Sequence, residues 1–214
     1  MDYGILSRCS IQSTSDQENY LQYAVIAANA PTGVTPEQAA VWAYPMNHEE
    51  AISPDALREE VIFNMVSAML LRIHQSGHLA KLDAERKALV KQALDIYKTI
   101  RQDIRISRPF WPLGLAGYSD EIVSLGLFVE GKAYLAVWKR GDKADCVTLP
   151  VSAAVRNALG GEELSVTCIY PDRESADAVY DPVQKTVKAA LPKPVMARLF
   201  ELKPAYEKAD AKNS

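Results

Sequence analysis

The hydrophobic pattern of this chain changes from a helical period to a period of two near Pro109, and this change constrains the fold more than any other feature. Before Pro109, apolar residues recur three or four positions apart from Asp55 to Ser76 and from Asp83 to Ile104, which predicts two helices. Their short link predicts an antiparallel pair. After Tyr118, about seven short segments alternate apolar and polar residues, a pattern typical of a small antiparallel sandwich.

The predicted strands of this second part are 122–129, 132–139, 146–151, 164–170, 178–181, 186–191 and 195–202. The Glu130-Gly131 pair between the first two is a hairpin signal. For the second helix, Asp83 is the expected N-cap, and Pro109 prevents its continuation. The expected class is therefore a helical part followed by an antiparallel part.

The first 45 residues are mixed in character. Ser10 to Ser15 has a strand-like pattern, and the stretch after Asp16 has a helical one. Ala39 to Tyr44 is a short apolar run that fits either a buried strand or the end of a turn. Asp16 is the most informative acid, because the junction of a strand and the following helix is where the chemistry of an α/β barrel lies. The alternative, an ordinary N-cap, is favoured by the local sequence alone.

Charge and cysteine content exclude several classes of protein. The chain has 24 Lys and Arg against 27 Asp and Glu, a net charge of −3, which does not fit a nucleic-acid binder. No apolar run approaches the ~18 residues of a membrane span, and no signal-peptide pattern is present, so we expect no membrane partner. Three widely spaced cysteines, Cys9, Cys146 and Cys168, fit reduced thiols in the cytoplasm.

Two other candidate sites are weaker. His74 and His78 have the spacing of metal ligands on a helix, but the glutamate that normally accompanies them is absent and Gly77 indicates a helix end. We therefore expect neither a metal nor a cofactor. The paired acids Glu49-Glu50 and Glu59-Glu60 are expected on solvated faces, the second pair opposite the apolar stripe of its helix.

Four aromatic residues lie in two clusters along the chain. Trp42, Tyr44, Phe110 and Trp111 fit either a sugar-binding platform or core and interface packing. Spacing alone favours the packing interpretation.

Several motifs in order resemble glycoside hydrolase family 36, the α-galactosidases. They are residues 2–8, 10–17 with Ile11-Gln12-Ser13-Thr14-Ser15-Asp16, 36–45, 63–79, 110–115 and 134–138. The resemblance is specific over residues 2–140 and looser over 141–203. It implies retaining hydrolysis of terminal α-galactosides such as melibiose or raffinose, with Asp16 as the general acid/base. Trp42 and Trp111 are the substrate-binding candidates.

The chain also departs from the family pattern. Members of the family are several times longer, and both their nucleophile and a Gly-rich stretch lie upstream of the matched region. Many bacterial members carry Trp where this sequence has Ser13. A complete barrel takes about 250 residues, whereas only about 115 precede the predicted sandwich here. We therefore expect the chain alone to have little or no activity.

The predicted protein is of the α+β class. Residues 1–117 form a mostly helical remnant of a partial (β/α) barrel, the C-terminal part of the catalytic domain. Residues 118–203 form a small antiparallel β-sandwich, and 204–214 a flexible tail. An incomplete barrel exposes strand edges, so we expect self-association. The alternatives are a non-catalytic carbohydrate-binding or interaction module and a fragment of a raffinose-synthase-like transferase.

Overall fold

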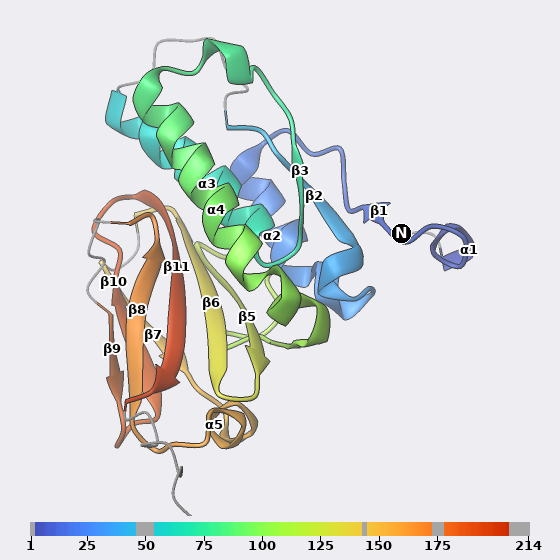
Figure 1. The fold of residues 1–214 in the computed structure, drawn as a ribbon. Coiled ribbons are helices and arrows are strands. Elements are labelled where there is room, and N and C mark those ends of the chain that lie inside the picture. Colours follow the sequence, from blue (N-terminus) through green and yellow to red (C-terminus); the bar gives the residue numbers. More distant parts are fainter. Residues whose placement is uncertain (1–2, 46–53, 143–144, 173–177, 206–214) are drawn as a thin grey trace, which may run out of the picture.

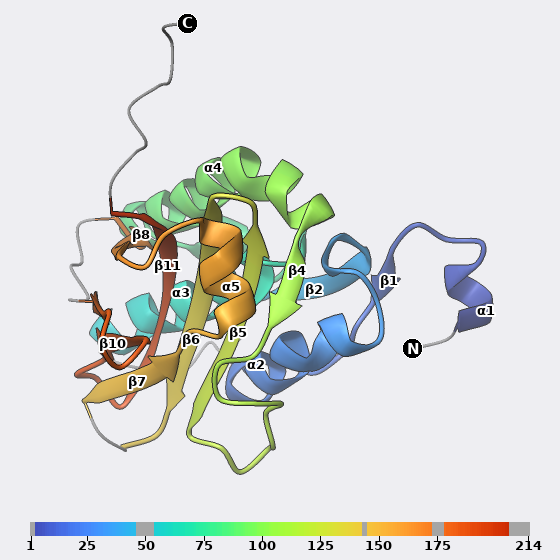
Figure 2. The same cartoon turned by 90° about the horizontal axis from the view of Figure 1, so that it is seen from below.

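The computed structural model describes residues 3–45, 54–142, 145–172 and 178–205, with the backbone alone for 54–57. The first part of the chain is a parallel sheet flanked by helices. This part packs on two stacked antiparallel sheets formed by the second part (Figures 1 and 2). The elements of the first part are α1 (Tyr3–Leu6), β1 (Gln12–Ser13), α2 (Tyr20–Asn29), η2 (Pro36–Gln38), β2 (Ala39–Ala43), α3 (Pro54–Met69), β3 (Arg72–Gln75) and α4 (Ala84–Ile106). Those of the second are β4 (Arg108–Phe110), β5 (Ile122–Val129), β6 (Lys132–Arg140), β7 (Cys146–Pro150), α5 (Ala153–Leu159), β8 (Leu164–Tyr170), β9 (Ala178–Asp181), β10 (Thr186–Ala190) and β11 (Val195–Pro204).

The first part alternates strand and helix. β1, β2 and β3 form a parallel sheet in that order, and α2 and α3 connect successive strands. Parallel neighbours need such crossover connections, because the chain must return to the same end of the sheet. The mixture of helices and antiparallel sheets confirms the predicted α+β class, and the alternation of strand and helix in this part is consistent with consecutive units of a (β/α) barrel.

The predicted helix from Asp55 to Ser76 is wrong at its C-terminal end. α3 ends at Met69, and Arg72–Gln75 is a strand that pairs with β2, Ile73 opposite Val41. Apolar residues close together, such as Leu71 and Ile73, satisfy a helical stripe and a buried strand equally well. The antiparallel helix pair is wrong for the same reason. β3 returns the chain between the helices, so α3 and α4 run in the same direction (Figure 1).

Helix α4 follows the prediction closely. The Asp83 side chain caps it by accepting a hydrogen bond of 2.8 Å from the Arg86 backbone N–H. Its buried stripe consists of Leu89, Val90, Ala93, Ile100 and Ile104. In the described ranges, no helix is both long and apolar enough to cross a membrane.

The seven predicted strands of the second part are all present as β5 to β11. β5 and β6 form the expected hairpin, in which Gly131 takes a left-handed φ of 79° that suits glycine. Two elements were not predicted. β4 adds a short edge strand to β5, and α5 lies between Ser152, its N-cap, and the left-handed Gly160. The sheet orders are β4-β5-β6-β11-β8 and β7-β10-β9.

The five-stranded sheet is buried on both faces. On β6, Tyr134, Ala136 and Trp138 belong to the core shared with the helices, while Leu135 and Val137 face the three-stranded sheet. The indole N–H of Trp138 donates to the Ser67 hydroxyl of α3 at 3.1 Å. The helical part and the sandwich therefore share one continuous core.

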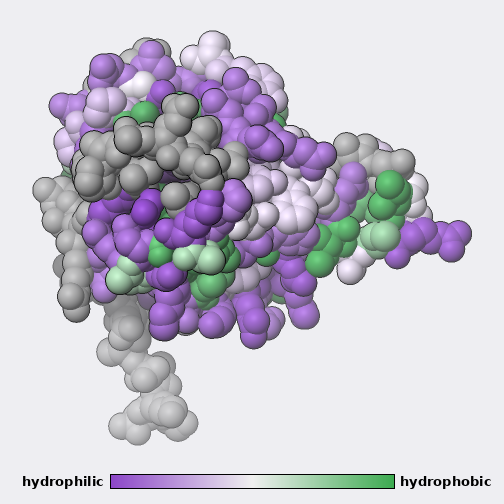
Figure 3. All heavy atoms as spheres, turned by 90° about the horizontal axis from the view of Figure 1, so that it is seen from above, coloured by the Kyte–Doolittle hydropathy of each residue, from purple (hydrophilic) through white to green (hydrophobic). Residues whose placement is uncertain are grey.

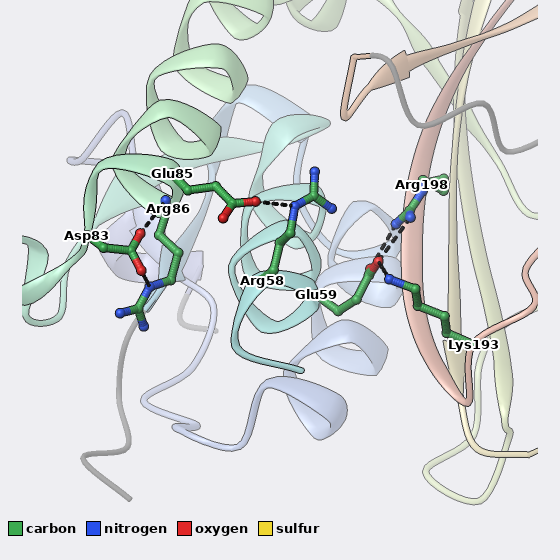
Figure 4. Close-up of polar contacts among 7 residues, drawn as sticks. All are labelled: Arg58, Glu59, Asp83, Glu85, Arg86, Lys193 and Arg198. Carbon is green, nitrogen blue, oxygen red and sulfur yellow. Dashed lines mark hydrogen bonds and ion pairs between the residues drawn. The ribbon is translucent and has the colours of Figure 1, made fainter. Parts of the chain in front are cut away.

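The prediction that Glu59 and Glu60 lie on a solvated face is wrong. They are only 3% and 4% exposed, and Glu49-Glu50 lies outside the described residues. The Glu59 carboxylate accepts hydrogen bonds from Arg198 at 2.9 and 3.0 Å and from Lys193 at 3.0 Å (Figure 4). Both cations come from the sandwich, and nothing in the local helical pattern indicates that they cover this face of α3.

Helix α1 projects away from the rest of the molecule (Figure 1). None of its residues is buried, and Tyr3 and Ile5 are 71% and 50% exposed. Figure 3 shows apolar surface at this projecting end. The helix adds nothing to the core, and the expected self-association stays a prediction.

Gly126 is required by the packing of β4 on β5. A Cβ built on Gly126 would lie 2.1 Å from ring atoms of Phe110, so Gly126→Ala forces the ring to move. We expect a loss of about 1–3 kcal/mol in the free energy of unfolding, measured by urea denaturation. Gly117→Ala is the matched control, because its Cβ would make ordinary contact with Asp120 at 3.5 Å. Equal stability of the two variants would contradict this packing argument.

Candidate active site

The loop from Thr14 to Asn19 leaves the C-terminal end of β1 and carries Asp16. Thr14 extends the strand pairing, since its backbone N–H and its hydroxyl both donate to the Ala40 carbonyl at 2.9 Å. The Ser15 hydroxyl then accepts from the Gln17 N–H at 3.0 Å and starts a local turn. These contacts fix Asp16 at the edge of the parallel sheet where the chain passes from strand to helix.

Tyr23 holds this loop against the sheet. From α2, its hydroxyl donates to the Ser15 carbonyl at 3.1 Å, accepts from the Trp42 N–H at 2.9 Å and lies 3.2 Å from the Thr14 hydroxyl. The side chain is 1% exposed, and burial raises the pKa of Tyr23, so the hydroxyl stays protonated and able to donate. Nothing in the local sequence distinguishes Tyr23 from an ordinary core tyrosine on a helix, so this role could not be predicted.

Asp16 is exposed and is not the cap of α2, which corrects the alternative interpretation of this residue. The cap is Asn19, whose side chain accepts from the Gln22 N–H at 3.1 Å. The Asp16 carboxylate lies close enough to Tyr23 and Tyr44 for its charge to act on both. At Tyr44, burial raises the pKa, and the charges of Asp16 and Glu18 raise it further.

Trp42 lies on β2 beside Asp16's loop, with its ring half-buried. Its indole N–H donates to the Ser13 hydroxyl at 2.9 Å. The ring stacks on Tyr44 at 6.3 Å between centroids and forms a T-shaped pair with the ring of His74 at 5.0 Å between centroids. Side chains from three adjacent strands thus form one aromatic and polar surface near Asp16.

The pairing of His74 and His78 on a helix does not exist. His74 lies on β3 and His78 in the loop after it, so the i, i+4 geometry expected of metal ligands is absent. Within the described ranges, no group of three or more His, Cys, Asp or Glu side chains could hold a metal ion.

Trp111 lies elsewhere. Its indole N–H donates to the Ala28 carbonyl at 2.7 Å, near the C-terminal end of α2, and its ring packs on the core shared by helices and sandwich. A helix of ten residues is about 15 Å long, and Asp16 lies at the other end of this one. The structure therefore brings Trp42 together with Asp16 but places Trp111 at the interface between α2 and the loop after β4.

Comparison with known proteins gives a clear answer for the fold. No family model and no curated protein matches the sequence. Among solved structures, an α-galactosidase AgaA variant from Geobacillus stearothermophilus in complex with raffinose matches 94% of this chain, with a TM-score of 0.69 and 17% identity. The chain has the fold of part of a GH36 α-galactosidase. The galactosidase domain of the α-galactosidase–sucrose kinase AgaSK matches equally well, with a TM-score of 0.69 and 15% identity over 94% of the chain.

The α-galactosidase from Lactobacillus brevis gives a TM-score of 0.63 and 13% identity over 93% of this chain. In all three structures the match spans 27% of the longer protein. That share is consistent with a C-terminal portion of the GH36 fold.

Proposed function

We propose that this chain is a portion of a GH36-type α-galactosidase and contributes the general acid/base, Asp16. The observation that carries the proposal is the position of Asp16, directly after a strand of a parallel (β/α) sheet whose fold matches GH36 enzymes. In this proposal, residues 1–117 correspond to the C-terminal part of the (β/α)8 barrel, 118–203 to the C-terminal sandwich and 204–214 to a tail.

The reaction needs a second carboxylate. Retaining glycosidases place two carboxyl groups about 5–5.5 Å apart. One attacks the anomeric carbon and forms the glycosyl-enzyme, while the other protonates the leaving oxygen and later removes a proton from water. In the described part of the chain, β2 is followed by Tyr44-Pro45 and β3 by Ser76-Gly77, so neither strand is directly followed by a carboxylate. We propose that the nucleophile comes from polypeptide outside this chain.

The proposed substrate is a terminal α-galactoside. Related structures were solved with raffinose, stachyose and 1-deoxygalactonojirimycin, which supports a galactose-sized sugar at the corresponding place. Trp42 and Tyr44 offer aromatic surface for the apolar face of such a sugar. We do not extend this role to Trp111, because it contacts the C-terminal end of α2, whereas Asp16 precedes the N-terminal end of this helix.

The isolated chain is expected to release no 4-nitrophenol from 4-nitrophenyl α-galactoside, because an acid/base alone cannot form the glycosyl-enzyme. Turnover is expected when this chain replaces the matched quarter of the Geobacillus stearothermophilus enzyme AgaA. The empty scaffold, without the replaced quarter, is the control. Robust turnover by the isolated chain that is lost in Asp16→Asn would contradict the external nucleophile. A folded but inactive chimera would contradict the proposed function itself.

A further inference from the structure

A pocket of about 330 Å³ lies at the end of the parallel sheet opposite to Asp16. It forms where η2, the first residues of β3 and the C-terminal half of α4 meet. Its polar lining consists of Glu37, Arg72, Tyr97, Arg101, Gln102 and Arg105. Since β2 and β3 begin here and Asp16 follows the end of β1, this pocket is separate from the candidate active site.

Three arginines converge on this pocket. Tyr97, Arg101 and Arg105 follow one another at four-residue intervals and share one face of α4, and Arg72 begins β3 beside them. Burial raises the pKa of Tyr97, and the charges of Arg72 and Arg101 oppose that shift, so both guanidinium groups lie near the same hydroxyl. None of the three makes an ion pair within 4 Å or a side-chain hydrogen bond with any described residue.

The pocket also contains an unused acceptor. The Glu37 carboxylate lines the pocket and makes no hydrogen bond or ion pair with any described residue. Its Oε2 atom is closed to solvent, so the other carboxylate oxygen is the one that a ligand in the pocket can reach. The three arginines do not occupy it, because none is within ion-pair distance. A ligand that fits this lining has an anionic group for the arginines and a hydroxyl group that can donate to Glu37.

We propose that this pocket binds a phosphorylated sugar or polyol. The phosphate would lie among Arg72, Arg101 and Arg105, since guanidinium groups match phosphate oxygens in charge and in bidentate geometry. A ligand hydroxyl would donate to Glu37. The volume of about 330 Å³ suits a monosaccharide phosphate, at the lower end of the usual range for small-molecule sites. This binding does not depend on Asp16 or on the proposed galactosidase activity.

Isothermal titration of the full chain with glucose 6-phosphate, inorganic phosphate and glucose tests the proposal. We expect glucose 6-phosphate to bind saturably and at least about tenfold more tightly than inorganic phosphate, since only the former also satisfies Glu37. Glucose alone should give no heat of binding. Absence of saturable glucose 6-phosphate binding would overturn the proposal, and equal affinities for the two phosphate probes would overturn the assigned ligand class.

Variants then locate the site. Arg101→Ala with Arg105→Ala should weaken glucose 6-phosphate binding by about tenfold or more. Lys87→Ala with Lys91→Ala removes the same charge from the N-terminal half of α4 and should leave the affinity unchanged. Glu37→Gln should reduce the preference for glucose 6-phosphate over inorganic phosphate, and Asp16→Asn should change neither affinity. An equal loss in the lysine control would show a general charge effect and overturn the proposed site.

Discussion

Asp16→Asn is expected to lower the hydrolysis of 4-nitrophenyl α-galactoside by the chimera with AgaA about a hundred- to ten-thousand-fold. Asparagine preserves the size of the side chain but can neither give a proton to the leaving oxygen nor take one from water. The surrounding loop should keep its shape, because it is held by Tyr23, Thr14 and Ser15 rather than by Asp16. The loss should therefore be chemical and not structural.

The dependence on the leaving group distinguishes an acid/base from a residue that only binds substrate. Asp16→Ala should impair a substrate with a poor leaving group, such as methyl α-galactoside, far more than 2,4-dinitrophenyl α-galactoside, whose departure needs no proton. With the dinitrophenyl substrate, added azide should accelerate turnover by replacing the water that Asp16 activates. Glu18→Gln is the matched control, because Glu18 is an exposed carboxylate two residues further along the same loop. Equal losses for all substrates, without azide rescue, would assign Asp16 to binding.

Glu59→Ala is expected to lower the free energy of unfolding by about 3–5 kcal/mol. The substitution removes the carboxylate shared by Arg198, which is 1% exposed, and Lys193. It leaves the positive charge of Arg198 inside the interface between α3 and β11, where water cannot reach it. Urea denaturation followed by circular dichroism measures the loss.

Glu85→Ala supplies the control. Glu85 pairs with Arg58 at the same 2.9 Å, but its side chain is 70% exposed, so the expected loss is about 0–1 kcal/mol (Figure 4). Replacing Glu59 and Arg198 together by methionine should recover most of the stability, because the double change removes both members of this buried pair and leaves neither charge without the other. Similar losses for Glu59→Ala and Glu85→Ala, or a double variant as unstable as the sum of its single changes, would contradict this account.

Much of the site could be predicted from local sequence. A strand-like run before Asp16 and a helical run after it indicated the junction, and the structure has β1 and α2 there. The importance of Tyr23 could not be predicted. Its hydroxyl meets the loop and β2 only because β1 pairs with β2, which brings together residues 26 positions apart such as Thr14 and Ala40. The sequence offered Trp42 and Trp111 as equal candidates for substrate binding. Only the tertiary packing shows that Trp42 lies near Asp16 and that Trp111 lies at the far end of α2.

The sequence by itself determined the elements whose signals are complete within a few residues. Asp83 caps α4, the Glu130-Gly131 turn joins β5 to β6, and period-two alternation marks all seven strands of the sandwich. The cap and the turn rest on hydrogen bonds and backbone conformations between near neighbours, which the local residues control. The alternation rests on strand geometry, because successive side chains of a strand point to opposite faces of the sheet.

Only the tertiary structure decided the identity of β3 and the burial of Glu59. Ile73 fits a helical stripe and a buried strand equally well, and pairing with β2 selects the strand. Glu59 looks solvated on a helical wheel, but Arg198, 139 residues later, supplies the opposite charge that lets it be buried. In both cases the deciding partner is distant in sequence, so the interaction energy that fixes the structure does not exist until the chain has folded.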